Sequence, residues 1–140
     1  IFQLSDLLSI TAPVGIFFGR ISNFLNKELI GKPTNFFLSV RYPNEDLYRH
    51  ISQIYEAVFE GLIPAIFLLF IFYKLKIKNG LITSLFLINY GLSRIIIENF
   101  REPDFQLGLK FDLLSQGQLL SIPILMLGFY FLYLCQFKQK

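Results

Sequence analysis

The chain has 140 residues, of which 54% are hydrophobic and only 16% are charged. About a quarter of the residues of a soluble domain are usually charged, so this composition predicts a membrane protein that resides in a lipid bilayer. The net charge of +3 comes from basic residues scattered among apolar runs, which argues against a nucleic-acid-binding protein. One cysteine, Cys135, excludes an intrachain disulfide. No Cys/His cluster offers a zinc site, so we expect no metal or other cofactor, and Cys135 is expected to act as a small apolar side chain.

The first part of the chain divides into an apolar and a polar stretch. Residues 1–18 are apolar but interrupted by Asp6, Pro13 and Gly15, which predicts the end of a membrane helix or a kinked, partly embedded segment. Residues 19–53 are the most polar tract of the chain. Turn signals at 31–34 and 42–46, with an apolar piece at 36–40 that can pair as a strand, predict a loop with its own local structure.

Three later segments are predicted to span the membrane as helices, at residues 54–73, 81–100 and 116–137. We therefore expect an all-α membrane protein in which residues 1–140 form a single transmembrane domain. It is a multi-span helical bundle with three clear transmembrane helices, a partial one at the N-terminus and a structured outer-face loop at 19–53.

Lysines set the expected orientation of this bundle. The connection between the first two clear spans carries Lys74, Lys76 and Lys78, which the positive-inside rule places in the cytoplasm. Lys138 and Lys140 agree, because the same count of spans puts the C-terminus inside. The count places residues 19–53 and 101–115 together on the outer side, where two polar regions can meet.

One face of the second clear span carries a ladder of polar residues. Its members recur at intervals of four, four and three residues and are neighbours on a regular helix: Tyr90, Arg94, Glu98 and Arg101. Arg94 lies about 21 Å along this helix, hence roughly 9 Å beneath the outer surface of a hydrocarbon core about 30 Å thick. Two interpretations stay open for an arginine at this depth. It pairs with Glu98 to fix helix packing, or its planar guanidinium group binds a lipid phosphate.

The start of the polar tract shows a second helical pattern. Arg20, Asn23 and Lys27 recur at helical spacing, with Phe24 and Glu28 on a neighbouring line. This pattern fits a solvated interfacial helix, and it also fits polar residues near lipid that need a polar partner.

Polar residues also mark the entry to the first clear span. Ser52 is a plausible helix cap, Glu56 lies one residue beyond the capping-box position, and Glu60 follows one turn later. His50 has no second histidine beside it, so a surface or headgroup-level position is favoured over a catalytic one.

Four ordered blocks of sequence resemble one bacterial family over essentially the whole chain. They are GRISNFLNKELIGKPT at 19–34, RHISQIYEAVFEG at 49–61, YGLSRIIIENFREPD at 90–104 and GQLLSIPIL at 117–125. Together they are similar to the prolipoprotein diacylglyceryl transferase family. The resemblance implies a seven-span bundle in the bacterial inner membrane, with its active site open to the outer side. It also implies transfer of the diacylglyceryl group of phosphatidylglycerol to the lipobox cysteine thiol of a preprolipoprotein, which forms a thioether and releases glycerol phosphate.

The resemblance also implies site residues. Arg20 matches the arginine of the family signature, Asn23 and Glu28 match its asparagine and acid, and Arg94 with Glu98 match a later arginine and acid. We expect Arg94, Arg20 and Glu98 to be catalytic, and Arg20, Asn23, Glu28 and Arg94 to bind the phosphatidylglycerol headgroup. The two glutamates are expected to orient the arginines, and a role as general base stays open for them.

Some positions depart from the family pattern. Ser22 and Lys27 stand where the signature often has glycine, and Ile51 stands where proline is common. The chain has about half of the family's usual length, without the N-terminal half that carries a His-Gly motif and a lipid-binding tyrosine. We expect a C-terminal portion or half-enzyme, with a separate N-terminal half as a candidate partner. The alternative is a non-enzymatic membrane component that binds lipid or packs a bundle, in which Arg94 and Glu98 simply pair.

Overall fold

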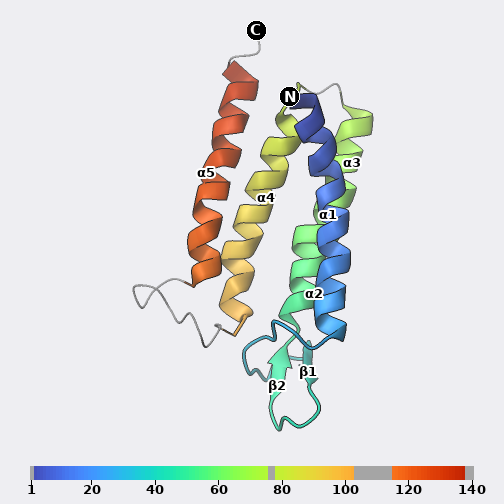
Figure 1. Ribbon diagram of the computed structural model, residues 1–140, viewed down its shortest axis with the longest axis vertical. Helices are drawn as coiled ribbons and strands as arrows, with labels where there is room; N and C mark the ends of the chain where they lie inside the picture. The colour runs from blue at the N-terminus through green and yellow to red at the C-terminus, as the bar shows by residue number, and fades with distance from the viewer. Residues whose placement is uncertain (1, 76–77, 103–114, 138–140) are drawn as a thin grey trace.

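The computed structural model describes residues 2–75, 78–102 and 115–137, and Figure 1 shows an antiparallel helical bundle with a β-hairpin at one end. The elements before the second membrane-length helix are α1 (Phe2–Leu25), β1 (Ser39–Arg41) and β2 (Tyr48–His50). That second helix is continuous through α2 (Ser52–Glu56), the π-helical segment η1 (Ala57–Leu62) and α3 (Ile63–Lys74). The remaining elements are α4 (Leu81–Ile97), the 3₁₀ turn η2 (Glu98–Phe100) and α5 (Gln116–Phe137).

Within the described residues, four helices are long and apolar enough to cross a membrane. They are Phe2–Leu25, Ser52–Lys74, Leu81–Phe100 and Gln116–Phe137. This confirms the predicted all-α, multi-span bundle and its three clear spans. The prediction of a partial N-terminal span is wrong, because α1 is a full helix of 24 residues.

Contacts with neighbouring elements explain why α1 continues through Asp6 and Pro13, which the sequence pattern predicts to interrupt a membrane helix. Asp6 is buried and caps α4, accepting hydrogen bonds from the backbone N–H groups of Gly80 at 2.7 Å and Thr83 at 2.9 Å. Pro13 lies buried inside α1, where packed neighbours tolerate a proline in a membrane helix. The sequence pattern shows only the local cost of these residues, and the hydrogen-bond partners of Asp6 lie more than seventy positions away in the chain.

Helix α1 ends in a Schellman motif. The backbone N–H of Lys27 donates to the carbonyl oxygen of Phe24, and that of Glu28 donates to the carbonyl oxygen of Asn23. Lys27 has φ of 59°, the left-handed conformation that glycine adopts most easily. The polar loop therefore begins after Leu25 instead of at residue 19, and Arg20 and Asn23 belong to a membrane helix.

The loop contains a short antiparallel hairpin. Ser39 pairs with His50, Val40 with Arg49 and Arg41 with Tyr48. The strand predicted at 36–40 is shifted to Ser39–Arg41, where it pairs with the three residues of β2. The residues before it make a different contact, since the carbonyl oxygen of Leu38 accepts a hydrogen bond from the Tyr55 hydroxyl at 3.0 Å.

Arg49 ties this hairpin to the segment that follows η2. Its guanidinium group contacts the carboxylates of Glu45 and Glu102 and donates to the carbonyl oxygen of Gly31 at 3.1 Å. The hydrogen bond to Glu45 is the main cause that raises the pKa of Arg49 above its usual value. Gly31 bridges to Arg101, and a Cβ at Gly31 would lie 2.2 Å from the His50 carbonyl oxygen, so this close approach requires glycine.

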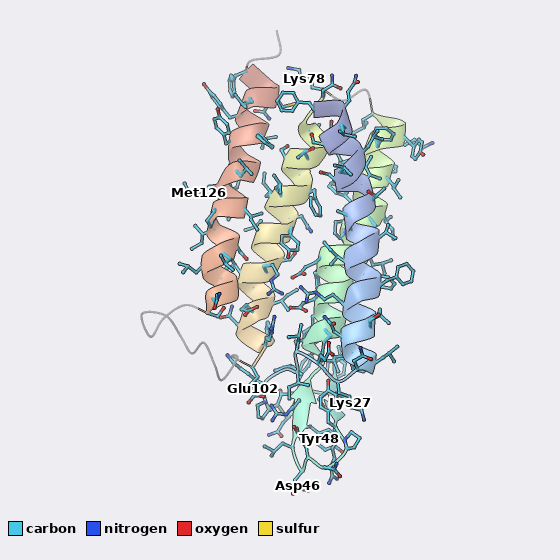
Figure 2. The ribbon with its side chains drawn as sticks, viewed as in Figure 1. Lys27, Asp46, Tyr48, Lys78, Glu102 and Met126 are labelled. Atoms are coloured by element: carbon cyan, nitrogen blue, oxygen red, sulfur yellow. The ribbon has the colours of Figure 1, made fainter. Side chains whose placement is uncertain are left out.

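The two polar regions meet at one end of the bundle, as predicted. Figure 2 shows Lys27, Tyr48 and Glu102 at the hairpin end and Lys78 at the opposite end. Lys76, Lys138, Lys140 and most of the 101–115 connection lie outside the described residues. The side of the membrane that each end faces stays a prediction.

Candidate site: buried arginines and glutamates

The centre of the candidate site is the π-helical segment η1, which follows α2 without a break. Glu56 ends α2 and Glu60 lies in η1, and both side chains are buried. A π-helical turn widens the helix locally and occurs frequently at functional sites. Helix α1 approaches this turn closely, because a Cβ on Gly61 would lie 2.7 Å from the Cβ of Phe17.

Arg20 on α1 reaches across to both of these glutamates. Its Nη1 lies 3.2 Å from Glu56 Oε2, and its Nη2 lies 3.4 Å from Glu60 Oε2. The two terminal nitrogens of one guanidinium group therefore contact two carboxylates one helical turn apart. This geometry fixes the plane of the guanidinium group.

Arg94 on α4 contacts the same two glutamates from another side. Its Nη1 lies 2.5 Å from Glu56 Oε1 and 3.8 Å from Glu60 Oε1. Its Nη2 lies 3.1 Å from Glu98 Oε2, which confirms the pairing expected from their four-residue spacing. Arg101 completes the ladder, with Nη1 4.0 Å from Glu98 Oε2.

These contacts form a largely buried group of three cations and three acids that we call the arginine–glutamate cluster: Arg20, Glu56, Glu60, Arg94, Glu98 and Arg101. The side chains of Glu56 and Glu60 are 1% and 0% exposed, and those of Arg20 and Arg94 are 16% and 11% exposed. Burying ion pairs is costly and adds little stability compared with apolar packing. Ionisable residues inside membrane helices therefore indicate a functional site as the first hypothesis.

The sequence interpretation missed Glu56 and Glu60 as members of the cluster. The capping interpretation is wrong, because the N-cap position of α2 is Ile51 and no side chain caps it. The Ser52 hydroxyl donates instead to the carbonyl oxygen of Leu29 at 3.3 Å. A usable signal was present in the sequence, since two acids one turn apart begin an apolar span with no basic residue nearby on the same helix.

The structure does not bring every expected site residue into the cluster. Asn23 lies on α1, three positions after Arg20, and is half-buried. The Glu28 side chain is exposed, and among the described residues it forms no ion pair. The main chain of Glu28 is used instead, since its carbonyl oxygen accepts a hydrogen bond from Gln53 Nε2 at 2.7 Å.

Helix α5 begins against Glu98. A Cβ on Gly117 would lie 2.7 Å from the Glu98 carboxylate carbon, so a larger residue there would displace this carboxylate. The first turn of a helix carries unpaired N–H groups and a partial positive charge, which favours a carboxylate there. The Glu98 carboxylate therefore lies between the start of α5, which it approaches at Gly117, and the Arg94 guanidinium group that it contacts.

An apolar groove of about 360 Å³ lies beside the cluster. Its walls come from the loop, α2, η1, α4 and η2, and consist of Phe36, His50, Tyr55, Phe59, Ser93, Ile96, Ile97 and Phe100. Several of these residues are direct chain neighbours of cluster residues, such as Ser93 before Arg94 and Ile97 before Glu98. A charged cluster and a hydrocarbon-compatible groove thus lie next to each other.

Fold and site together define a multi-pass α-helical membrane protein with charged residues buried between its helices near one end. The sequence model of the family described as prolipoprotein diacylglyceryl transferase matches residues 1–134, and the chain belongs to this family.

Curated relatives give the same result. The chain is 50% identical over 131 residues to the phosphatidylglycerol–prolipoprotein diacylglyceryl transferase of Rickettsia bellii strain OSU 85-389, covering 91% of the chain and 50% of that protein. It is 48% identical over 141 residues to the protein of that name from Rickettsia felis, covering 99% of the chain and 54% of the relative. The chain spans about half the length of the curated relatives it matches.

Proposed function

We propose that this chain carries the phosphate-binding part of a site that transfers the diacylglyceryl group of phosphatidylglycerol to the cysteine thiol of a prolipoprotein. The supporting observation is the pair of buried arginines, Arg20 and Arg94, held by the shared carboxylates of Glu56 and Glu60. The reaction is the one that the names of its relatives describe.

The arginines keep donors available for a ligand. A guanidinium group has five N–H donors, and the ion pairs of Arg20 and Arg94 use their terminal nitrogens. The Nε–H group of each arginine has no hydrogen-bond partner among the described residues. The glutamates thus orient the arginines, and the donors left over suit the oxygens of a phosphate.

This arrangement suits the proposed chemistry. The thiol sulfur forms a bond to a glycerol carbon, the bond from that carbon to the phosphate oxygen breaks, and glycerol phosphate leaves with the electron pair while the thiol gives up its proton. Negative charge grows on the leaving phosphate, so fixed guanidinium groups stabilise the transition state more than the ground state. A cationic site also lowers the pKa of an incoming thiol. Arg94 and Arg20 take these roles, and Glu98 positions Arg94.

The groove supplies the apolar counterpart. A lipid donor needs space for hydrocarbon next to the site that binds its headgroup, and the groove beside Ser93 and Ile97 offers apolar walls there. Asn23, at the end of α1, is assigned to headgroup binding with the arginines. Glu28 belongs to the same proposal through family resemblance alone.

The orientation is part of the proposal. The hairpin end faces the outer side of the bacterial inner membrane, and the end with Lys78 and the C-terminus faces the cytoplasm. A cysteine introduced at the fully exposed Asp46 is expected to react with a membrane-impermeant maleimide in intact cells with a permeabilised outer membrane. Labelling only after the inner membrane is disrupted would reverse the orientation.

Transfer is tested with the chain in phosphatidylglycerol vesicles, both alone and mixed with the part of the Rickettsia bellii relative that the chain does not cover. Phosphatidylglycerol labelled in its diacylglycerol part and a peptide with a lipobox cysteine are the substrates. Labelled thioether product is expected from the mixture and is expected to disappear with Arg20→Ala or Arg94→Ala. Near-normal transfer by both variants would overturn the assignment of these residues.

The arginine–glutamate cluster contains three arginines and three glutamates, so its charges can neutralise each other without a ligand. This favours one alternative function, a non-enzymatic membrane component in which the ion pairs only fix helix packing. This rival predicts that a folded complex of the two parts forms and transfers no label. The same vesicle experiment separates the two, because complex formation is measured independently by co-purification.

A further inference from the structure

The loop at the hairpin end exposes large apolar side chains. Five of them lie between positions 36 and 48 and are 44–81% exposed, and we call them the apolar loop surface: Phe36, Phe37, Leu38, Leu47 and Tyr48. Phe37 is the most exposed, at 81%. Figure 2 shows Tyr48 on the hairpin that extends beyond the helix ends. Large exposed apolar side chains gathered in one short segment mark a site of contact with a membrane or with another protein.

The hairpin has two different faces. Arg49 lies on the face that contacts Glu102 and Gly31, so this face is fixed to the bundle. Neighbouring residues in a strand point to opposite faces, which places Tyr48 on the other face together with its partner Arg41. The Tyr48 residue and the Arg41 side chain are 54% and 55% exposed. The exposed part of this second face thus combines an aromatic ring with a cation.

The apolar loop surface is continuous with the lipid-facing helices. The Phe36 ring packs against the Phe37 ring, with centroids 4.5 Å apart and planes tilted by 50°, and Phe36 lines the same groove as Phe59 and Ile96. Phe59 and Ile96 are themselves more than half exposed on membrane-length helices. One apolar strip therefore runs from the sides of two spans, across the edge of the groove, to Phe37.

We propose that the apolar loop surface inserts into the headgroup–acyl boundary of the leaflet at this end of the bundle. The apolar strip is continuous with the sides of two spans, which lipid covers. The same leaflet is therefore expected to cover the apolar loop surface. Aromatic rings, a tyrosine hydroxyl and an arginine with an apolar stem are the groups that this boundary accommodates best. The inference requires only that the four helices cross the bilayer, and it does not depend on the transfer reaction.

The absence of tryptophan from the sequence gives a clean test. A single tryptophan is introduced as Phe37→Trp, and the full chain is reconstituted in phosphatidylglycerol–phosphatidylethanolamine vesicles. We expect emission at short wavelength, strong quenching by lipids brominated near the top of the acyl chains, and protection from aqueous acrylamide. Tyr48→Trp is a second reporter on the same surface, so the test does not depend on one variant folding.

Two matched variants calibrate the measurement. Phe67→Trp, on α3 and 53% exposed, is expected to be quenched by lipids brominated deep in the chains. Asp46→Trp, at the hairpin turn, is expected to be quenched by acrylamide. The inference is overturned if the reporters at 37 and 48 behave like that at 46. It is also overturned if they gain protection only when an acceptor peptide is added, since the surface would then bind that peptide.

Discussion

Glu56 and Arg94 lie on different helices, and their side chains meet at 2.5 Å between Oε1 and Nη1. The other carboxylate oxygen of Glu56 lies 3.2 Å from Arg20, so one glutamate links two arginines. Because Glu56 is almost fully buried, water cannot replace either contact. Glu56 therefore makes the shorter contact to each arginine, and Glu60 is the second carboxylate that both share.

Replacing Glu56 with glutamine keeps its shape and removes its charge. We expect Glu56→Gln to lower the free energy of unfolding by about 3 kcal/mol, because two largely buried arginines lose one of the two carboxylates that they share. Thermal unfolding in detergent measures this loss. The matched control is Asp46→Asn, which removes the exposed partner of Arg41 and should cost about 0–1 kcal/mol. Equal stability losses for the two variants would contradict the role assigned to Glu56.

Replacing Arg94 with lysine keeps the charge and loses the planar group that reaches Glu56 and Glu98 together. Each charged hydrogen bond lost is worth about 1.5–3 kcal/mol, so transfer should fall roughly 10- to 100-fold. The measurement is the initial rate of label transfer in the vesicle assay. Arg41→Lys, in an exposed pair, should leave this rate unchanged, and an equally active Arg94→Lys would show that charge alone suffices at this position.

Gly61 sets the distance between α1 and η1. A methyl group there would lie 2.7 Å from the Cβ of Phe17, so Gly61→Ala should push the helices apart and cost about 1–3 kcal/mol of stability. Gly15→Ala on α1 is the control, since a Cβ there meets nothing within 4 Å. The control should be neutral or stabilising by up to about 1 kcal/mol, because alanine is a better helix former than glycine. The midpoint of thermal unfolding should fall for Gly61→Ala and should stay the same or rise for Gly15→Ala.

Lys27 occupies a left-handed position at the end of α1, with φ of 59°. A non-glycine residue in this conformation costs on the order of 1 kcal/mol, so Lys27→Gly should raise the free energy of unfolding by about that amount. Lys32→Gly, at another exposed lysine of the loop, is the comparison. An unchanged or lower unfolding midpoint for Lys27→Gly would show that the Lys27 side chain makes a compensating interaction.

Sequence reasoning predicted the features that depend on local pattern. The three later spans follow from apolar length, and the Arg94–Glu98 pair follows from a four-residue spacing on one helix. The meeting of the two polar regions at one end follows from counting spans. The resemblance to the transferase family, carried by four blocks of sequence, is confirmed.

The features that were missed depend on contacts between distant segments. Asp6 and Pro13 read as breaks, because their sequence neighbours do not show that α4 and the rest of the bundle accommodate them. Glu56 reads as a capping residue, because its true partners lie on two other helices. The order of residues along one helix does not show which side chains of other helices will contact it. Glu28, expected beside the arginines, instead contributes its main chain to the end of α1.

Helix α1 is held at two levels. Near its start Asp6 binds the first turn of α4, and near its end Arg20 binds Glu56 and Glu60. These two residues are about 21 Å apart along the helix. They are separated by nearly four full turns and so lie on nearly the same face of α1, which means that both sets of contacts form at one rotation of α1 about its axis. One residue inserted between them would turn one end by about 100° relative to the other, and either the cap on α4 or the guanidinium contacts would be lost. The spacing between Asp6 and Arg20 thus acts as a length constraint that transmits the position of one bundle end to the charged group at the other.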